Sequence, residues 1–300
     1  MVAGRLLINW PMTTSTPKTV LITGASSGIG KAAALALLAE GIRVFAAVRS
    51  ERAAEGLRSA APADGTTRLD TLDLDVTNAD QIRAAVARID ATVGADGLWG
   101  LFNNAGINIA GPLEHLPLDR LRRQLEVNVI GQVAVTQAFL PLLRKARGRI
   151  VTTGSNSGYF SAPGLAPYCM SKYAMESFSD ALRRELRPWG IEVSLLEPGA
   201  IATEIWQTSI SEFNEFLRNA PPGLLESYSG LLDASGHAAR RSAGRAAPVD
   251  VVSRDVIHAF TARRPRTRYR IGRGSMSRKW MSYLPDRWTD ELVAKSLGWG

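Results

Sequence analysis

Short apolar runs alternate with longer helical segments along most of this chain, and this alternation most constrains how it can fold. The short runs are rich in Val, Ile and Leu, as strands buried on both faces are. The longer segments repeat their apolar residues with a helical period. Strands and helices in alternation build βαβ units, whose consecutive strands are parallel. We therefore predict an α/β fold: a doubly wound parallel β-sheet of about seven strands, with helices on both faces.

The periodicity also places the individual elements. The expected strands are residues 19–23, 43–48, 69–74, 97–103, 148–153, 191–196 and 267–271. The expected helices are residues 31–40, 78–93, 119–144, 168–189 and 248–262. Residues 203–247 carry aromatic and apolar side chains without a strand pattern, and we expect a substrate lid there. All these elements fall into one domain, residues 18–274, expected both to bind a dinucleotide and to catalyse.

The two ends of the chain lie outside this pattern. Residues 1–17 hold a short apolar patch behind one arginine, and we expect a disordered leader, with Met12 as an alternative start. Residues 275–300 form a C-terminal tail without a clear pattern. No apolar run approaches the roughly 20 residues of a membrane span. The single cysteine, Cys169, excludes an intrachain disulfide, and we expect a cytoplasmic protein.

The net charge of +8 arises in one basic stretch. Eight Lys and Arg residues and no acid lie between Arg263 and Lys279, so the rest of the chain is balanced. Positive charge confined in this way does not indicate nucleic acid, and we predict no nucleic-acid partner. One interpretation of the stretch is a solvated face or oligomer rim. The other is a weak peripheral contact with acidic lipid headgroups, helped by the apolar and aromatic residues Trp280, Tyr283, Leu284 and Trp288.

A glycine-rich loop, residues 23–30 with the sequence TGASSGIG, directly follows the first strand. Gly24 allows a tight turn, Gly28 lets the backbone approach a pyrophosphate, and Gly30 permits close packing of the helix on the strand. The N-terminus of that helix offers free N–H groups and a positive dipole to an anion. We therefore predict that a dinucleotide is bound by Gly24, Ser26, Ser27, Gly28, Ile29 and Gly30.

The residues after the second strand select the nicotinamide cofactor. Selectivity for NAD(H) needs a carboxylate there for the ribose 2′-hydroxyl, but Val48 stands at this position. The next residue, Arg49, has no acid beside it and suits the 2′-phosphate of NADP(H), with weaker help from Lys31 and Arg52. We predict NADP(H), with NAD(H) as the less favoured cofactor.

Two further motifs end strands at the edge where ligands bind in such sheets. Asp75 and Val76 follow the third strand, and a carboxylate there would lie near the adenine amine. Asn104, Ala105 and Gly106 follow the fourth strand. We assign these five residues to the cofactor site.

Tyr168 and Lys172 lie four residues apart in an expected helix, so they share one face. A nearby ammonium favours the phenolate, and we expect Lys172, together with a nearby nicotinamide cation, to lower the pKa of Tyr168 well below its usual value near 10. Ser155 ends the fifth strand, where its hydroxyl can donate to a substrate carbonyl; Ser157 is the competing serine. Asn128, inside a helix, either holds a water that links Lys172 to solvent or is a satisfied amide.

Together these motifs resemble the compact branch of the short-chain dehydrogenase/reductase family. The loop 23–30, NNAG at 103–106, NVIG at 128–131, Ser155, Tyr168 with Lys172, and PG at 198–199 with Thr203 stand in the family's order and spacing. The family often has Ser-Ser where this chain has Gly154-Ser155. The forms TGS and EPG, with Arg49, look more like hydroxysteroid and retinol dehydrogenases.

The resemblance implies a Rossmann-type fold and a catalytic tetrad of Asn128, Ser155, Tyr168 and Lys172. It implies that Tyr168 and Lys172 also contact the cofactor, Lys172 through the nicotinamide ribose. It further implies carboxamide contacts from the segment after the sixth strand, through Pro198, Gly199, Ile201 and Thr203. Such enzymes are usually homodimers or homotetramers that associate through the helices expected at 119–144 and 168–189.

We therefore expect an NADP(H)-dependent oxidoreductase that moves hydride between nicotinamide and a carbonyl or secondary alcohol. Tyr159, Phe160, Ile205 and Trp206 indicate a lipophilic substrate, steroid-like, retinoid-like or smaller, although packing would also explain each of them. A dinucleotide-sensing regulator without turnover is the alternative, which an intact tetrad disfavours. The three histidines lie far apart without acidic partners, so no metal site is predicted.

Overall fold

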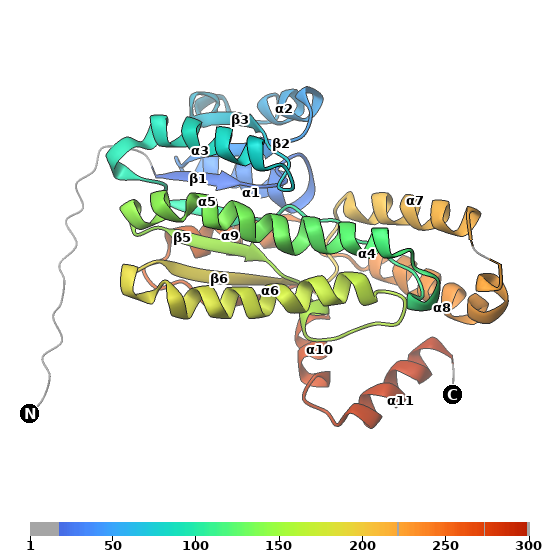
Figure 1. Cartoon of the computed structure of the whole chain (residues 1–300). Coiled ribbons are helices and arrows are strands. Elements are labelled where there is room, and N and C mark those ends of the chain that lie inside the picture. Colours follow the sequence, from blue (N-terminus) through green and yellow to red (C-terminus); the bar gives the residue numbers. More distant parts are fainter. Residues whose placement is uncertain (1–17, 221, 273, 299–300) are drawn as a thin grey trace, which may run out of the picture.

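The computed structural model describes residues 18–220, 222–272 and 274–298 (Figure 1), so the predicted leader and Arg273 lie outside the described residues. The strands are β1 (Thr19–Ile22), β2 (Arg43–Val48), β3 (Leu69–Asp73), β4 (Gly100–Asn103), β5 (Arg149–Thr153), β6 (Glu192–Pro198) and β7 (Arg268–Ile271). They form one parallel sheet in the order β3-β2-β1-β4-β5-β6-β7. The order reverses between β1 and β4, which opens a crevice at the carboxyl ends of the strands. The predicted doubly wound sheet is confirmed.

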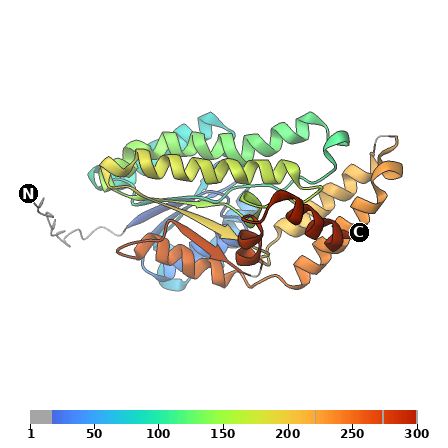
Figure 2. The same cartoon turned by 90° about the horizontal axis from the view of Figure 1, so that it is seen from below.

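Helices cover both faces of this sheet, as Figure 2 shows. One face carries α1 (Gly28–Ala39) and α9 (Asp250–Thr261), and the other carries α3 (Ala79–Val93), α5 (Gly131–Ala146) and α6 (Ala166–Glu185). Side chains alternate along β1, so that Val20 and Ile22 face the first pair and Leu21 faces the second group. A fully buried aliphatic side chain contributes about 1.5–3 kcal/mol, and these two cores fix the positions of the strand ends.

The long helix predicted at residues 119–144 consists of three pieces. α4 (Leu118–Leu125) leads into a π-helical turn, Glu126–Ile130, and then into α5. Contrary to our expectation from the sequence, this stretch is long and apolar enough to cross a membrane by length and composition, alone among the described helices. Its side chains Val135 and Phe139 are fully buried against the sheet, as in a core helix.

The segment predicted as a lid forms two helices, α7 (Ile205–Arg218) and α8 (Leu224–Gly244). Both extend past the carboxyl ends of the strands, beside α4 (Figure 1). Phe216 of α7 lies under the Arg120 guanidinium, 5.0 Å from ring centre to carbon, and the Tyr228 hydroxyl of α8 donates to Glu114 at 2.7 Å. These contacts attach the two helices to the segment around the start of α4, and their role as a lid stays a prediction.

The C-terminal residues, for which no pattern was evident, form α10 (Ser275–Met281) and α11 (Asp286–Leu297). Two bonds anchor α10 directly after the edge strand β7. The Ser275 hydroxyl donates to the Glu197 carbonyl oxygen at 2.9 Å, and the Tyr159 hydroxyl donates to the Ser275 carbonyl oxygen at 2.9 Å. α10 is therefore part of the folded unit and lies beside the residues that follow β5.

The basic stretch 263–279 is not one solvated face. Arg268 and Arg270 pair with Glu197, whose side chain is 1% exposed, at 3.2 Å and 3.0 Å. Arg268 also pairs with Glu176 of α6 at 3.0 Å. The interpretation as a solvated face is therefore wrong for these two arginines, because acids from other elements meet them inside the fold. Contact with lipid headgroups stays a prediction, supported by the exposed side chains of Trp280, Tyr283 and Trp288.

Candidate active site

The glycine loop joins β1 to α1 at the crevice. Gly24 has a φ of +64°, a left-handed conformation that glycine adopts without strain. A Cβ at Gly30 would lie 2.5 Å from Nδ2 of Asn104, so only glycine lets α1 pack this closely. Ser27, the N-cap of α1, makes no side-chain cap bond, and the first turn contains no acid. The N–H groups of this turn are therefore available to an anion, as the glycine pattern predicts.

Asn104 ties the loop to the neighbouring strands. Its Nδ2 donates to the carbonyl oxygens of Thr23 and Gly24, both at 3.1 Å, and its Oδ1 accepts from the Thr153 hydroxyl at 3.2 Å. The Ala105 N–H donates to the Thr23 hydroxyl at 3.0 Å. These bonds occupy the Asn104 amide, so this residue shapes the cofactor site rather than offering its side chain to a ligand.

The segment after β6 lies over the same loop. A bridge between Ile201 and Ala247 fixes it. The Thr203 side chain is 3.1 Å from the position that a Cβ would take at Gly28, so it borders the space above the loop. Among the residues predicted to contact the cofactor from this segment, the partly exposed ones are Gly199 and Thr203, and the buried ones are Pro198 and Ile201.

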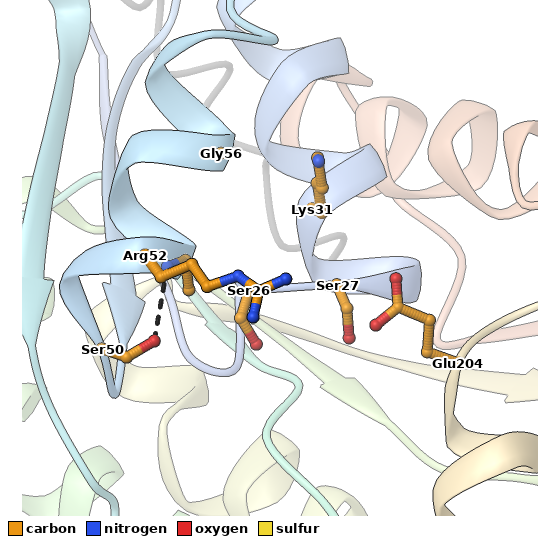
Figure 3. Close-up of a pocket in the computed structure, with 8 residues that line it drawn as sticks. Ser26, Ser27, Lys31, Ser50, Arg52, Gly56 and Glu204 are labelled. Atoms are coloured by element: carbon orange, nitrogen blue, oxygen red, sulfur yellow. Dashed lines mark hydrogen bonds between the residues drawn. The ribbon is translucent and has the colours of Figure 1, made fainter.

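An open cleft of about 420 Å³ lies beside the loop, next to the start of α2 (Glu51–Arg58) (Figure 3). Its lining is mostly polar: Ser26, Ser27, Lys31, Ser50, Arg52, Ala53, Gly56 and Glu204. In Figure 3 the Arg52 side chain extends across the cleft toward Ser26, and the Glu204 carboxylate borders the opposite end. Two cations and three hydroxyls thus surround a space adjoining the glycine loop. Such a lining suits a phosphate group at the Arg52 end.

Arg49 does not line this cleft, and its predicted contact with the 2′-phosphate stays a prediction. Its side chain is 71% exposed and its guanidinium lies 3.7 Å from the Asp75 carboxylate, so the inference that no acid lies near it is wrong. Burial would raise the pKa of Asp75, but hydrogen bonds from Thr77 and the charge of Arg49 hold that pKa below its usual value. The cations that line the cleft are Lys31 and Arg52, which we had assigned only a minor part.

Tyr168, Lys172 and Ser155 meet where α6 passes the end of β5. The Lys172 ammonium nitrogen lies 5.6 Å from the centre of the Tyr168 ring and donates to the Thr153 carbonyl oxygen at 2.7 Å. The Ser155 hydroxyl hydrogen-bonds the phenol and accepts from the Ser157 N–H at 3.1 Å. Of the two candidate serines, Ser155 therefore faces the tyrosine.

Burial shifts the pKa values of both members of the Tyr168–Lys172 pair. Burial raises the pKa of Tyr168 to about 12, and the hydrogen bond from Ser155 offsets this only in part. Burial also lowers the pKa of Lys172, to about 8. Desolvation of the phenol is the largest cause of this raised pKa, and the lowering expected from Lys172 together with a nicotinamide cation stays a prediction. At neutral pH the tyrosine holds its proton and is able to donate it.

Asn128 lies in the π-helical turn between α4 and α5, a distortion frequent at functional sites. Its Oδ1 accepts from the Ile107 N–H at 2.8 Å, and its Nδ2 donates to the Ile107 carbonyl at 3.0 Å and to the Ser171 hydroxyl at 3.1 Å. The amide is thus satisfied, and it connects the segment after β4 to the residue before Lys172. Its part in proton supply stays a prediction.

The four predicted substrate residues have different surroundings. Tyr159 is buried, and its hydroxyl holds α10, so it anchors the C-terminal segment instead of facing a substrate. The Trp206 indole N–H donates to the Ile201 carbonyl at 2.8 Å and fixes the start of α7. Ile205, 37% exposed, and the partly exposed Phe160 are the two whose side chains are accessible to a ligand.

Two polar residues beside Ser155 were not predicted. The Asn156 Oδ1 accepts from the Ser155 hydroxyl at 3.4 Å and from the Arg278 guanidinium at 3.1 Å. Arg278 belongs to α10, and its guanidinium lies 5.3 Å from the centre of the Phe160 ring. No local signal marks this arginine, because its partners are more than a hundred residues away along the chain.

A glycine loop at a parallel-sheet crevice, next to a Tyr-Lys-Ser group, defines a dinucleotide-binding oxidoreductase. Residues 18–213 match the family described as short chain dehydrogenase, and the chain belongs to that family. It is 37% identical to NADPH-dependent 3-dehydrocapnine reductase of Ornithobacterium rhinotracheale, over 92% of this chain and 96% of that protein. It is 38% identical to human retinol dehydrogenase 16 (92% and 87%) and to human 17-beta-hydroxysteroid dehydrogenase type 6 (93% and 88%).

A solved structure agrees with this assignment. The crystal structure of a short-chain dehydrogenase from Streptomyces avermitilis is 26% identical, with a TM-score of 0.72, and the match covers 95% of this chain and 97% of that one. The resemblance inferred from the motifs is confirmed, including the narrower likeness to retinol and hydroxysteroid dehydrogenases. The protein is a short-chain dehydrogenase/reductase, a family whose typical cofactor is a nicotinamide dinucleotide.

Proposed function

We propose that the protein is an NADP(H)-dependent reductase of lipophilic ketones or aldehydes, or the dehydrogenase of the corresponding alcohols. The cleft of Figure 3 carries the cofactor preference, because Arg52 and Lys31 line the space next to the glycine loop. Two cations there suit an adenosine 2′-phosphate, whereas the hydroxyl of NAD(H) would bring no negative charge to them. The relative named as NADPH-dependent supports the same preference.

The described residues fit such a dinucleotide. The available N–H groups of α1 and the side chain of Thr203 border the space above the loop, which a Cβ at Gly28 would enter. The nicotinamide, when bound, supplies or accepts the hydride. The residues of the chain itself handle the proton and the charge on the substrate oxygen.

Tyr168 and Ser155 act together on the substrate oxygen. With a pKa of about 12, Tyr168 keeps its proton at neutral pH and donates it to the carbonyl oxygen as that oxygen gains negative charge. The Ser155 hydroxyl donates a hydrogen bond to the same oxygen. Lys172, with a pKa of about 8, is the neighbouring ammonium that stabilises the phenolate left behind and returns a proton to it.

The apolar character of the substrate is supported by the residues around the crevice. Ile205 is 37% exposed at the start of α7, and Phe160 is partly exposed beyond Ser155. The relatives named retinol dehydrogenase and 17-beta-hydroxysteroid dehydrogenase indicate the same class of substrate. We include a homodimer or homotetramer in the proposal, because Ile130, Met170 and Tyr173 expose 53%, 47% and 45% of their surface on adjoining helices.

The test follows the loss of NADPH absorbance, and then of NADH absorbance, with a panel of lipophilic ketones and aldehydes. We expect turnover that prefers NADPH and disappears in Tyr168→Phe, with Tyr159→Phe as the matched control because that phenol holds α10. Tight NADPH binding without turnover on any carbonyl would favour the sensing regulator instead. Faster turnover with NADH would refute the assignment of Arg52 and Lys31.

A further inference from the structure

Arg278 is a partly buried cation without a carboxylate partner among the described residues. Its Nη1 donates to the Asn156 Oδ1 at 3.1 Å, and its guanidinium faces the Phe160 ring. Burial lowers the pKa of Arg278, and the neighbouring titratable groups are the thiol of Cys169 and the phenol of Tyr159. A desolvated cation without a counter-ion is costly to maintain. This cost would be offset by a ligand that brings a negative charge.

Two other arginines of the same segment, Arg268 and Arg270, are paired with acids inside the fold. Arg268 and Arg270 each pair with the buried Glu197, and Arg268 also reaches Glu176. Arg278 lies further along the chain, in α10, and its neighbours in the described structure are the Phe160 ring and the Asn156 amide. Its charge is therefore not part of this ion-pair network.

The position of Arg278 relates it to the reacting group. The Asn156 Oδ1 accepts from both Arg278 and Ser155, so the guanidinium lies two hydrogen bonds from the serine that faces Tyr168. A carbonyl oxygen held by Ser155 would place the atoms a few bonds further along the substrate within reach of Arg278. Phe160 lies beside the same guanidinium and offers an apolar surface to the rest of such a molecule.

We propose that Arg278 forms an oxyanion-binding subsite beside the reacting carbonyl, so that the preferred substrate is a lipophilic ketone with a carboxylate, sulfonate or phosphate close to that carbonyl. A guanidinium binds such groups through paired, charge-assisted hydrogen bonds, which suits the donors that Asn156 leaves open. The identity of the reacting group rests on the proposed function, whereas the binding of an anion by Arg278 does not.

The first test measures binding alone, by calorimetry on the protein loaded with NADP⁺. Decanoate, decanesulfonate and decanol are compared below their micellar concentrations. We expect the two anions to bind about 10- to 100-fold more tightly than the alcohol, and Arg278→Gln to remove this preference. Arg287→Gln, which removes an exposed charge from α11, should keep it. Equal binding of anion and alcohol by the unmodified protein would overturn the subsite.

The second test measures turnover of a γ-keto fatty acid and of its methyl ester with NADPH. We expect Arg278→Gln to lower kcat/KM for the acid about 10- to 100-fold and for the ester by little, with Arg278→Lys in between. An equal loss on both substrates would overturn the subsite, because it would mean that Arg278 only positions Ser155 through Asn156. If no ketone is turned over while the anion preference in binding still depends on Arg278, the subsite stands and the proposed function fails.

Discussion

Replacing Arg52 by glutamine tests which arginine receives the adenosine 2′-phosphate. Arg52 extends across the cleft beside the glycine loop, whereas Arg49 is already paired with Asp75 and 71% exposed. A hydrogen bond to a charged group contributes about 1.5–3 kcal/mol, and each 1.4 kcal/mol is tenfold in affinity. The cleft is open to solvent, so the lower part of this range applies. We therefore expect Arg52→Gln to weaken NADPH binding about 10- to 30-fold.

The matched control is Arg49→Gln. An exposed ion pair such as Arg49 with Asp75 contributes about 0–1 kcal/mol, so this variant should lose less than about fivefold in NADPH affinity. NADH affinity should change little in either variant, because NADH lacks the 2′-phosphate. The assay titrates each protein with NADPH and NADH by calorimetry. A larger NADPH loss in Arg49→Gln than in Arg52→Gln would refute the cleft assignment and restore Arg49 as the phosphate ligand.

Three further predictions concern proton supply, the anchoring of α10 and assembly. The rate of ketone reduction should fall as the pH rises above about 8, because Lys172 loses its proton there. Tyr168, with a pKa of about 12, keeps its proton over the same range. A rate that stays constant above that pH would contradict this role of Lys172. Tyr159→Phe removes the bond to Ser275 and should lower the free energy of unfolding by about 1 kcal/mol, measured by urea denaturation, and an unchanged midpoint would argue against this anchor. Tyr173→Glu places a charge on an exposed apolar face and should reduce the mass found by light scattering to that of one chain, so an unchanged multimer would exclude this interface.

The fold and the meeting of Tyr168, Lys172 and Ser155 were predictable because their signals are local. Buried parallel strands need continuous apolar runs, and the turn from β1 to α1 needs glycine at Gly24 and Gly30, where the φ angle and the close packing admit little else. Tyr168 and Lys172 are one helical turn apart, so their spacing alone puts them on one face. The structure then distinguished Ser155 from Ser157 by placing Ser155 against the phenol.

The features that were not predictable depend on contacts between distant segments. Arg49 meets Asp75 because β2 and β3 are neighbours in the sheet, a pairing that the residues next to Arg49 in the chain do not reveal. The raised pKa of Tyr168 follows from burial, which the spacing of two residues does not determine. The approach of Arg278 to Ser155 through Asn156 requires the C-terminal helix α10 to return to the end of β5.

The most direct test of the central claim compares Ser155→Ala with Ser157→Ala, since the two serines stand in the same turn and one of them faces Tyr168. NADPH oxidation is followed with the best ketone of the panel, and NADPH affinity is measured alongside. We predict that Ser155→Ala lowers kcat about 10²- to 10³-fold with NADPH binding retained, as expected for the loss of one donor to the substrate oxygen, while Ser157→Ala stays within a few fold. Full activity in Ser155→Ala, or an equal loss in Ser157→Ala, would contradict proton transfer by a Tyr168–Ser155 pair.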